Sequence, residues 1–316
     1  MVEINPPMAL TKIHGHIALF TANLIFGLNT AISRTIIPDI VDPFTLTFFR
    51  LIGATVLFWI ISLFTKKEPI PVKDLLLLLF ASMFGIVLNQ VPYISGLSMT
   101  SPIDASLVTS LLPILTMLLA AVLIKEPITW LKAIGVLVGA SGAFILIMNS
   151  SNAKGNGNLM GDLIILSAST SFAIYLTAFK KIISKYSPIS TMKWMFLFAT
   201  IISFPICRKS LIQTDFSSLD STVWLRIAYV VVFATFISYI LIPIGQKTLR
   251  PTTMSMYNYV QPIVASFLAV GLGMDTFGYE KIVSTLLVFA GVYIVTQSKS
   301  RSQVEQEKQM KPASRL

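Results

Sequence analysis

Residues 101–147 have the sequence SPIDASLVTSLLPILTMLLAAVLIKEPITWLKAIGVLVGASGAFILI. Two long apolar runs flank a short charged turn, Lys125-Glu126-Pro127. Each run is close to the roughly 20 residues that a helix needs to cross about 30 Å of hydrocarbon. The pattern predicts two membrane-spanning helices joined by a Glu-Pro loop.

The rest of the chain has the same character. Of its 316 residues 54% are hydrophobic and only 12% are charged, about half the charged fraction of a soluble domain. We therefore expect an all-α integral membrane protein with ten transmembrane helices. Charges, turns and prolines divide the chain into spans near 17–37, 44–64, 75–99, 103–124, 128–148, 161–183, 189–207, 222–246, 252–273 and 278–297.

The basic residues predict the orientation. With the first residue inside, the cytoplasmic segments contain seventeen lysines and arginines, the outer segments contain six, and Arg50 lies within a span. This is a positive-inside bias, so we expect a multi-pass protein of the cell inner membrane with both termini in the cytoplasm. The net charge of +10 is spread over the loops, and we expect no nucleic-acid partner.

An internal repeat relates the two halves. At an offset of 149 residues the pairs are Gly96 with Gly245, Pro102 with Pro251, Ser106 with Ser255, Pro113 with Pro262 and Gly142 with Gly291. At the front of each half an offset of 146 pairs Gly15 with Gly161 and Phe26 with Phe172. Because each copy has five spans, an odd number, the copies must be inverted repeats, and in such carriers the binding site lies near the midplane between them.

The repeat predicts the domain boundaries. We expect the first five-helix repeat over 13–149, a linker over 150–160 rich in small and polar residues, and the second repeat over 161–297. The polar, charged segment 298–316 is expected to be a disordered cytoplasmic tail.

With these features the chain resembles the drug/metabolite transporter superfamily, specifically proteins with two tandem EamA-type domains. The resemblance is carried by the mid-helix proline, the Glu-Pro pair and the glycine-spaced helix, at Pro113, Glu126-Pro127, Gly135 and Gly142. The second copy departs from the pattern, with Asp275 in place of the glutamate, no proline after it, and Ser284 at the place of Gly135. The resemblance implies a secondary transporter of a small molecule, with amino acids or their derivatives favoured and drugs or nucleotide sugars as alternatives.

Four prolines interrupt the predicted spans. Pro113 and Pro262 release the carbonyls of Thr109 and Asn258 from helical hydrogen bonds, and Pro92 and Pro243 release those of Leu88 and Tyr239. A freed carbonyl in hydrocarbon must face protein, water or cargo. Each proline is therefore a hinge or kink, and the freed carbonyls are candidate ligands.

Polar stripes predict the lining of a cavity. Asn89 and Tyr93 lie on a small and polar face of the third span, and Tyr257, Asn258 and Gln261 lie on a similar face of the ninth. In the resembling family these helices surround the central path, and further candidates are Asn29, Tyr175 and Tyr239. The alternative is that these side chains form hydrogen bonds between helices.

Arg50 is a full charge about 9 Å from the outer end of its predicted span. An arginine at a helix centre costs about 2.5–3.5 kcal/mol, so it needs a partner or a watery cavity. No Asp or Glu lies in the interior of a predicted span, and the nearest, Asp104, is at the outer mouth of the fourth span. The candidate partner is a carboxylate on the cargo, and the alternative is hydrogen bonding to backbone carbonyls near the outer face.

Other functions are less consistent with the sequence. It lacks a His-Glu-x-x-His motif, a Walker loop and an aspartate pair in the spans, so we expect no enzyme, no cofactor and no metal site. A channel or a non-transporting membrane subunit remains an alternative. Gly135 and Gly139 form a small-xxx-small face, whose partner is another helix of the chain or a second copy in a homodimer.

Overall fold

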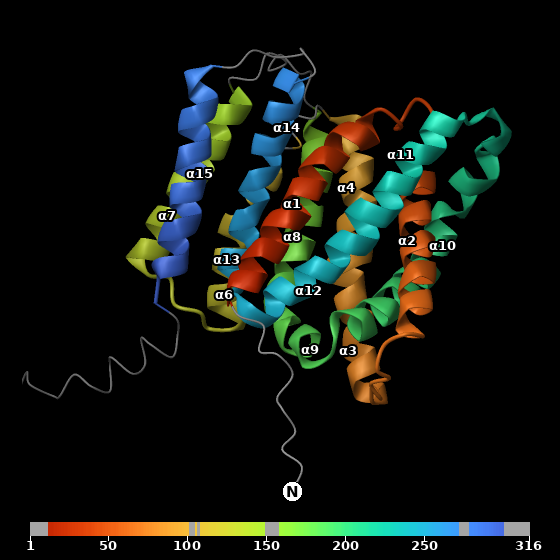
Figure 1. Ribbon diagram of the computed structural model, residues 1–316, viewed down its shortest axis with the longest axis horizontal. Helices are drawn as coiled ribbons and strands as arrows, with labels where there is room; N and C mark the ends of the chain where they lie inside the picture. Colours follow the sequence, from red (N-terminus) through yellow and green to blue (C-terminus); the bar gives the residue numbers. More distant parts are fainter. Residues whose placement is uncertain (1–11, 101–104, 106–107, 149–157, 272–277, 300–316) are drawn as a thin grey trace, which may run out of the picture.

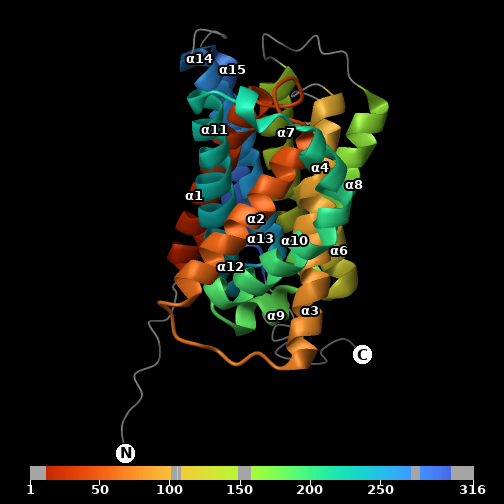
Figure 2. The same cartoon turned by 90° about the vertical axis from the view of Figure 1, so that its right-hand side faces the viewer.

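The computed structural model describes residues 12–100, 105, 108–148, 158–271 and 278–299, and these residues form helices joined by short connections (Figures 1 and 2). The helices of the first half are α1 (Lys12–Arg34), α2 (Pro43–Ser62), α3 (Val72–Ser82), η1 (Met83–Val87), α4 (Leu88–Met99), α6 (Leu112–Leu123) and α7 (Trp130–Met148). Those of the second half are α8 (Leu159–Ala178), α9 (Lys180–Lys185), α10 (Pro188–Gln213), η2 (Phe216–Ser218), α11 (Ser221–Val231), η3 (Val232–Ile237), α12 (Ser238–Thr248), α13 (Pro251–Met256), η4 (Tyr257–Tyr259), α14 (Val260–Gly271) and α15 (Tyr279–Gln297).

Seven helical stretches of the described chain are long and apolar enough to cross a membrane. Two of them are composite: Val72–Met99 joins α3, η1 and α4, and Ser221–Thr248 joins α11, η3 and α12. The prediction of an all-α, multi-pass membrane protein is confirmed. The shorter helices α6 and α7 and the interrupted α13–η4–α14 lie at the other three predicted spans, so the count of ten stays a prediction.

The starts of several helices follow from local chemistry. Pro43, Pro188 and Pro251 each occupy the first position of a helix, where a missing N–H costs nothing. The Asp42 carboxylate accepts from the Phe44 N–H at 2.8 Å, which satisfies one of the free N–H groups at the start of α2.

The structure corrects several predicted boundaries. The sixth predicted span ends early, at Ala178, and α9 is a separate short helix. The seventh continues to Gln213 rather than ending at 207, because long basic side chains at a helix end can extend to the aqueous interface without breaking the helix.

Three predicted spans are irregular inside. The third and eighth contain the π-helical turns η1 and η3, and the ninth is interrupted by the 3₁₀ turn η4. The hydroxyls of Thr235, in η3, and of Ser238, directly after it, donate to carbonyls five residues earlier, at 2.8 and 3.0 Å. These bonds stabilise the wider turn, which sequence periodicity does not reveal.

The two halves pack with pseudo-two-fold symmetry. α7 packs on α15 and α2 packs on α10, and these are equivalent helices of the two halves. The packing of α1 on α12 and α14 is repeated by the packing of α8 on α4 and α6. The inverted repeat predicted from the offsets is therefore visible in the helix contacts.

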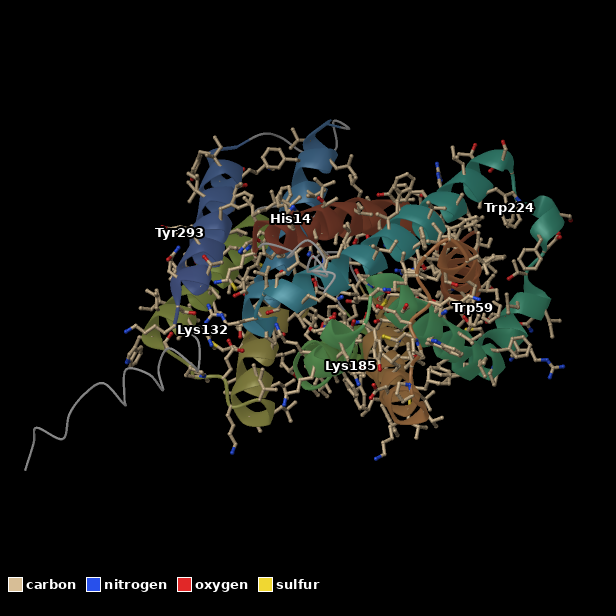
Figure 3. The ribbon with its side chains drawn as sticks, turned by 60° about the horizontal axis from the view of Figure 1, so that its bottom comes forward. His14, Trp59, Lys132, Lys185, Trp224 and Tyr293 are labelled. Atoms are coloured by element: carbon tan, nitrogen blue, oxygen red, sulfur yellow. The ribbon has the colours of Figure 1, made fainter. Side chains whose placement is uncertain are left out.

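One end of the bundle, which we call the terminal face, carries both the start of α1 and the end of α15. Gly15 packs against Thr248 and Leu249, and the Arg250 side chain donates to the Lys299 carbonyl at 3.1 Å. The start of α3 and the end of α9 meet at the same end, where Lys185 and Asp74 form an ion pair at 2.5 Å. This is the lower end of the molecule in Figure 1, and Figure 3 turns it towards the viewer.

The small-xxx-small face of α7 is occupied within the chain. A Cβ on Gly135 would lie 2.9 Å from the Val295 nitrogen, and one on Gly291 would lie 2.5 Å from the Gly139 nitrogen. The helices α7 and α15 therefore approach each other backbone to backbone, and this face of α7 is not available to a second copy.

Candidate functional site

A polar cavity, which we call the main cavity, lies between the two halves and contains about 680 Å³ of space including its mouth. Its lining comes from α1, α2, α4, α6, α8, α12, η4 and α14, together with the turn before α6. The lining residues are Phe26, Asn29, Thr30, Arg50, Asn89, Gln90, Tyr93, Thr109, Leu112, Ser169, Phe172, Tyr239, Asn258 and Gln261.

Arg50 is the charged residue of this lining, and it is only 4% exposed. Its Nε donates to Thr235 Oγ1 at 3.0 Å, while the Thr235 hydroxyl donates its own hydrogen to the Val230 carbonyl at 2.8 Å. The Thr235 oxygen therefore acts only as an acceptor towards Arg50, and its bond to the Val230 carbonyl holds the Thr235 side chain in place. Within the described part of the chain no carboxylate forms an ion pair with Arg50.

The two terminal nitrogens of the Arg50 guanidinium, Nη1 and Nη2, have access to the cavity. In the described structure only the Nε of Arg50 has a protein acceptor. Nη1 and Nη2 are nevertheless not among the fully buried polar atoms without a hydrogen-bond partner, so they are not sealed off from the cavity. A guanidinium held at Nε presents Nη1 and Nη2 as a planar fork, which matches the two oxygens of a carboxylate or phosphate.

Amide side chains of α1 and η4–α14 form a connected group beside the main cavity. Gln261 Nε2 donates to Asn23 Oδ1 at 2.9 Å and to Asn258 Oδ1 at 2.8 Å. Asn258 Nδ2 donates to the Ser255 carbonyl at 3.0 Å. These bonds fix the amides and connect the first half of the protein to the second.

A second polar group joins α4 to α8 and α12. Asn89 Nδ2 donates to the Ala168 carbonyl at 3.2 Å. Gln90 Nε2 donates to the Tyr239 hydroxyl at 2.9 Å. Gln90 and Tyr239 are 149 residues apart, so equivalent positions of the two repeats meet here.

Eight of the ten predicted cavity residues line the main cavity: Asn29, Arg50, Asn89, Tyr93, Thr109, Tyr239, Asn258 and Gln261. The other two, Tyr175 and Tyr257, lie nearer the terminal face. The Tyr175 hydroxyl donates to Gln246 Oε1 at 2.9 Å, and the Tyr257 hydroxyl is 2.6 Å from His16 Nδ1.

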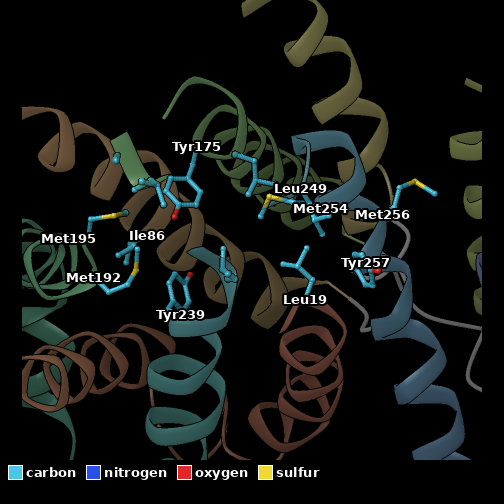
Figure 4. Packing of buried hydrophobic residues seen from close by; sticks show 14 of the residues in the cluster. Leu19, Ile86, Tyr175, Met192, Met195, Tyr239, Leu249, Met254, Met256 and Tyr257 are labelled. Carbon is cyan, nitrogen blue, oxygen red and sulfur yellow. The ribbon is translucent and has the colours of Figure 1, made fainter. Parts of the chain in front are cut away.

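Tyr175 and Tyr257 belong to a sealed layer between the main cavity and the terminal face. Around them pack Leu19, Leu176, Ile242 and Met254, all at most 4% exposed. Figure 4 shows part of this layer, where Leu19 of α1 and Met254 of α13 lie near Leu249, from the connection between α12 and α13. In this conformation the cavity is closed towards the terminal face.

The sequence prediction missed several lining residues, among them Gln90, Phe26 and Phe172. Gln90 directly follows Asn89 and therefore lies off the three-and-four stripe used to find the cavity face. The repeat offers a signal for all three, since Gln90 is equivalent to Tyr239, and Phe26 to Phe172.

The four predicted hinge prolines lie beside irregular turns. Pro92 and Pro243 lie inside α4 and α12, shortly after the π turns η1 and η3. Pro113 lies at the start of α6, and Pro262 follows the 3₁₀ turn η4 in α14. Pro92, Pro113 and Pro262 directly adjoin residues of the main cavity, where freed backbone carbonyls have somewhere polar to face.

The Glu-Pro pair has a structural position outside the cavity. Lys125 adopts a left-handed backbone with φ 53°, and the Glu126 N–H donates back to the Ala120 carbonyl at 3.0 Å, which closes the end of α6. The turn brings Glu126 to Lys132, whose ammonium donates to the carboxylate at 2.8 Å and to the Pro127 carbonyl at 2.7 Å. Lys132 is labelled in Figure 3, at the terminal face.

The EamA-like transporter family model matches residues 13–148 and again residues 159–297. The chain belongs to the EamA-like transporter family. The two matched segments correspond to the two structural halves, and this membership makes the protein a transporter rather than an enzyme. The recognition of the drug/metabolite transporter superfamily from the sequence is thereby confirmed.

Similar proteins include transporters of an archaeon and a bacterium, and a plant protein. An "Uncharacterized transporter" of Archaeoglobus fulgidus is 26% identical over 260 residues, covering 82% of this chain and 90% of the relative. The "Uncharacterized transporter YyaM" of Bacillus subtilis is 24% identical, covering 77% and 80%. "Protein WALLS ARE THIN 1" of Arabidopsis thaliana is 24% identical, covering 92% and 84%.

A solved structure titled "Crystal structure of protein" has the same fold. It superposes with a TM-score of 0.73 at 20% identity, covering 93% of this chain and 98% of that one. At this identity the likeness describes the fold and not the cargo.

Proposed function

We propose that this EamA-family protein exports or exchanges a small carboxylated metabolite, an amino acid or a derivative, across the inner membrane by alternating access. The observation that carries the proposal is Arg50. A buried arginine without a carboxylate partner in the described chain contributes an uncompensated charge to the cavity. A carboxylate on the cargo would supply that partner.

The rest of the lining suits a zwitterion. The amide oxygens of Asn258 and Asn29 in the lining are acceptors for an ammonium group. Rings of Phe26, Phe172 and Tyr93 offer apolar surface for a side chain. A phosphate could also bind the guanidinium fork, so a nucleotide sugar is a distinct outcome of the same test.

Two features support alternating access. The pseudo-symmetric helix contacts provide two half-structures that can exchange conformations around a site between them. The cavity is closed towards the terminal face, which we assign to the cytoplasm on the positive-inside bias. With that assignment both chain ends are cytoplasmic.

The test is counterflow in proteoliposomes. Vesicles loaded with each unlabelled amino acid are diluted into the same amino acid carrying a radiolabel, and a carrier accumulates label transiently whereas a channel does not. Arg50→Ala should abolish accumulation of a carboxylated cargo but not that of its amide. Arg50→Lys should restore little, because an ammonium lacks the planar fork.

A matched control is Arg208→Ala, since Arg208 is an exposed arginine at the end of α10. It should leave counterflow unchanged. Each variant is also checked for a single symmetric peak in size-exclusion chromatography, so that lost transport is not lost folding. Equal counterflow by wild type and Arg50→Ala would exclude the proposed role of the arginine.

A further inference from the structure

A second, smaller cavity, with only about 20 Å³ of room for water, adjoins the main cavity, and we call it the inner cavity. It is lined by Leu19, Asn23, Phe26, Phe172, Leu176, Ile242, Met254 and Asn258. Phe26, Phe172 and Asn258 line both cavities. The other five lie closer to the ends of their helices at the terminal face, so the inner cavity continues the main cavity in that direction.

The internal repeat relates the inner cavity to the main cavity. At the offset of 146 for α1 and α8, Asn23 is equivalent to Ser169, Phe26 to Phe172 and Leu176 to Thr30. At the offset of 149 for the later helices, Ile242 is equivalent to Tyr93 and Asn258 to Thr109. Six of the eight inner lining residues therefore have equivalents in the main cavity: Ser169, Phe172, Phe26, Thr30, Tyr93 and Thr109.

The same set of repeat positions thus lines a cavity twice, a wide one on the side of the main cavity and a narrow one at the inner cavity. Thr30, Tyr93 and Ser169 lie towards the face opposite the terminal face, and their part of the main cavity is open enough to leave Thr30 and Tyr93 partly exposed. On the inner side the equivalent Leu176 and Ile242 are buried. In an inverted repeat, exchange of the two half-conformations turns the narrow copy into the wide one.

We propose that the inner cavity is the collapsed inner half of the cargo route, and that Phe26 and Phe172 together form the partition between the two halves. The proposal rests on the proposed alternating-access function. Because each phenylalanine is the other's equivalent and both line both cavities, the partition is the same pair of rings in either conformation. Opening the inner half closes its outer equivalent.

The lining also gives the inner half its chemistry. Leu19, Leu176, Ile242 and Met254 present aliphatic and thioether groups, and the amides Asn23 and Asn258 are the polar groups among the eight lining residues. The equivalent outer positions carry hydroxyls at Thr30, Tyr93, Thr109 and Ser169. The inner half is therefore suited to a cargo that has an apolar portion besides its carboxylate.

Cysteine accessibility tests the proposal without a known cargo. Cys207 is the single cysteine of the sequence, so Cys207→Ala gives a background without thiols. Leu176→Cys is then placed in the inner half and Tyr93→Cys in the outer half. A membrane-impermeant methanethiosulfonate reagent is applied to right-side-out and inside-out vesicles, and Lys181→Cys, exposed on α9, is the control for access from the terminal face.

The expected result is labelling of Leu176→Cys from the terminal face and of Tyr93→Cys from the opposite face. A wedge in the outer half, Thr30→Trp, should keep that half open and slow labelling of Leu176→Cys at least tenfold. The reciprocal wedge Leu176→Trp should slow labelling of Tyr93→Cys, and it replaces the first wedge if Thr30→Trp does not fold.

Three results would overturn the inference. They are labelling of Leu176→Cys from the face opposite the terminal face, no labelling while Lys181→Cys reacts, and labelling that neither wedge changes. The last would indicate a static cavity rather than half of a route. Since the labelling needs no cargo, absence of amino-acid counterflow with reciprocal labelling would refute the proposed cargo and leave the route intact.

Discussion

Replacing Gly291 by alanine tests the close contact between the two halves. Gly291 lies in α15, and a Cβ there would be 2.5 Å from the Gly139 nitrogen and 2.7 Å from the Gly135 carbonyl oxygen. Ordinary contacts of a Cβ begin near 3.4 Å. The neighbouring atoms are backbone and cannot rotate away, so α7 and α15 must separate locally by about 1 Å to relieve a contact of this kind.

The expected cost follows from two opposing terms. Overpacking of a close-packed interface costs about 1–3 kcal/mol, and rigid backbone contacts correspond to the upper end of that range. Alanine in a helix is favoured over glycine by about 1 kcal/mol. We therefore expect a net destabilisation of about 2 kcal/mol.

The assay is thermal unfolding in detergent, followed by tryptophan fluorescence, with Gly271→Ala as the matched control. Gly271 lies at the end of α14, and a Cβ there has no atom within 4 Å, so the same substitution should leave the melting midpoint unchanged or slightly higher. A midpoint for Gly291→Ala equal to or above that of wild type would refute the reasoning that glycine is required for backbone contact.

Thr235→Val removes the acceptor for Arg50 Nε, a charged hydrogen bond worth about 1.5–3 kcal/mol, and should raise KM for a carboxylated cargo at least tenfold in counterflow, with Thr235→Ser close to wild type. Glu126→Ala leaves the Lys132 ammonium buried without its carboxylate and should cost about 3–5 kcal/mol, whereas the double replacement Glu126→Leu with Lys132→Met should recover most of the lost melting temperature. Burial lowers the pKa of Lys180, which lies in α9 outside the spans, to about 8. Because the unfolded chain binds the extra proton between pH 8 and the ordinary value near 10.5, stability should rise over that window, and Lys180→Met should lack the rise; parallel pH profiles of the two melting midpoints would contradict this assignment.

Much of the architecture could be predicted because a bilayer imposes strong constraints on sequence. Apolar length specifies where spans lie, proline specifies where they start, and the odd number of spans per repeat requires inversion. Boundaries failed where side chains, not periodicity, decide the helix. The hydroxyls of Thr235 and Ser238 stabilise a π turn, and the basic end of α10 continues as a helix beyond its predicted stop.

The candidate site was predictable to the extent that polar residues on a hydrophobic helix must face inwards. That rule identified Arg50, Asn89 and Asn258. It does not tell how far along the helix axis the cavity extends, and so which inward-facing residues reach it. Tyr175 satisfies it and yet lies in the sealed layer, because its hydroxyl reaches Gln246 rather than the cavity. Phe26 and Phe172 carry no polar signal, and apart from their equivalence in the repeat only their position between two cavities distinguishes them from core residues.

Sequence alone was sufficient to predict a membrane protein, its internal repeat and the need of Arg50 for a partner. These conclusions depend on the length of the apolar runs, on their spacing and on the position of a charge within one of them, all of which can be read along the chain. The tertiary structure decided which groups meet: Arg50 Nε with Thr235, Gln90 with its repeat equivalent Tyr239, and α7 with α15 through glycine. It also decided that the main cavity is wide and the inner cavity narrow. Such choices depend on packing between segments about 150 residues apart, and local sequence contains no distance between them.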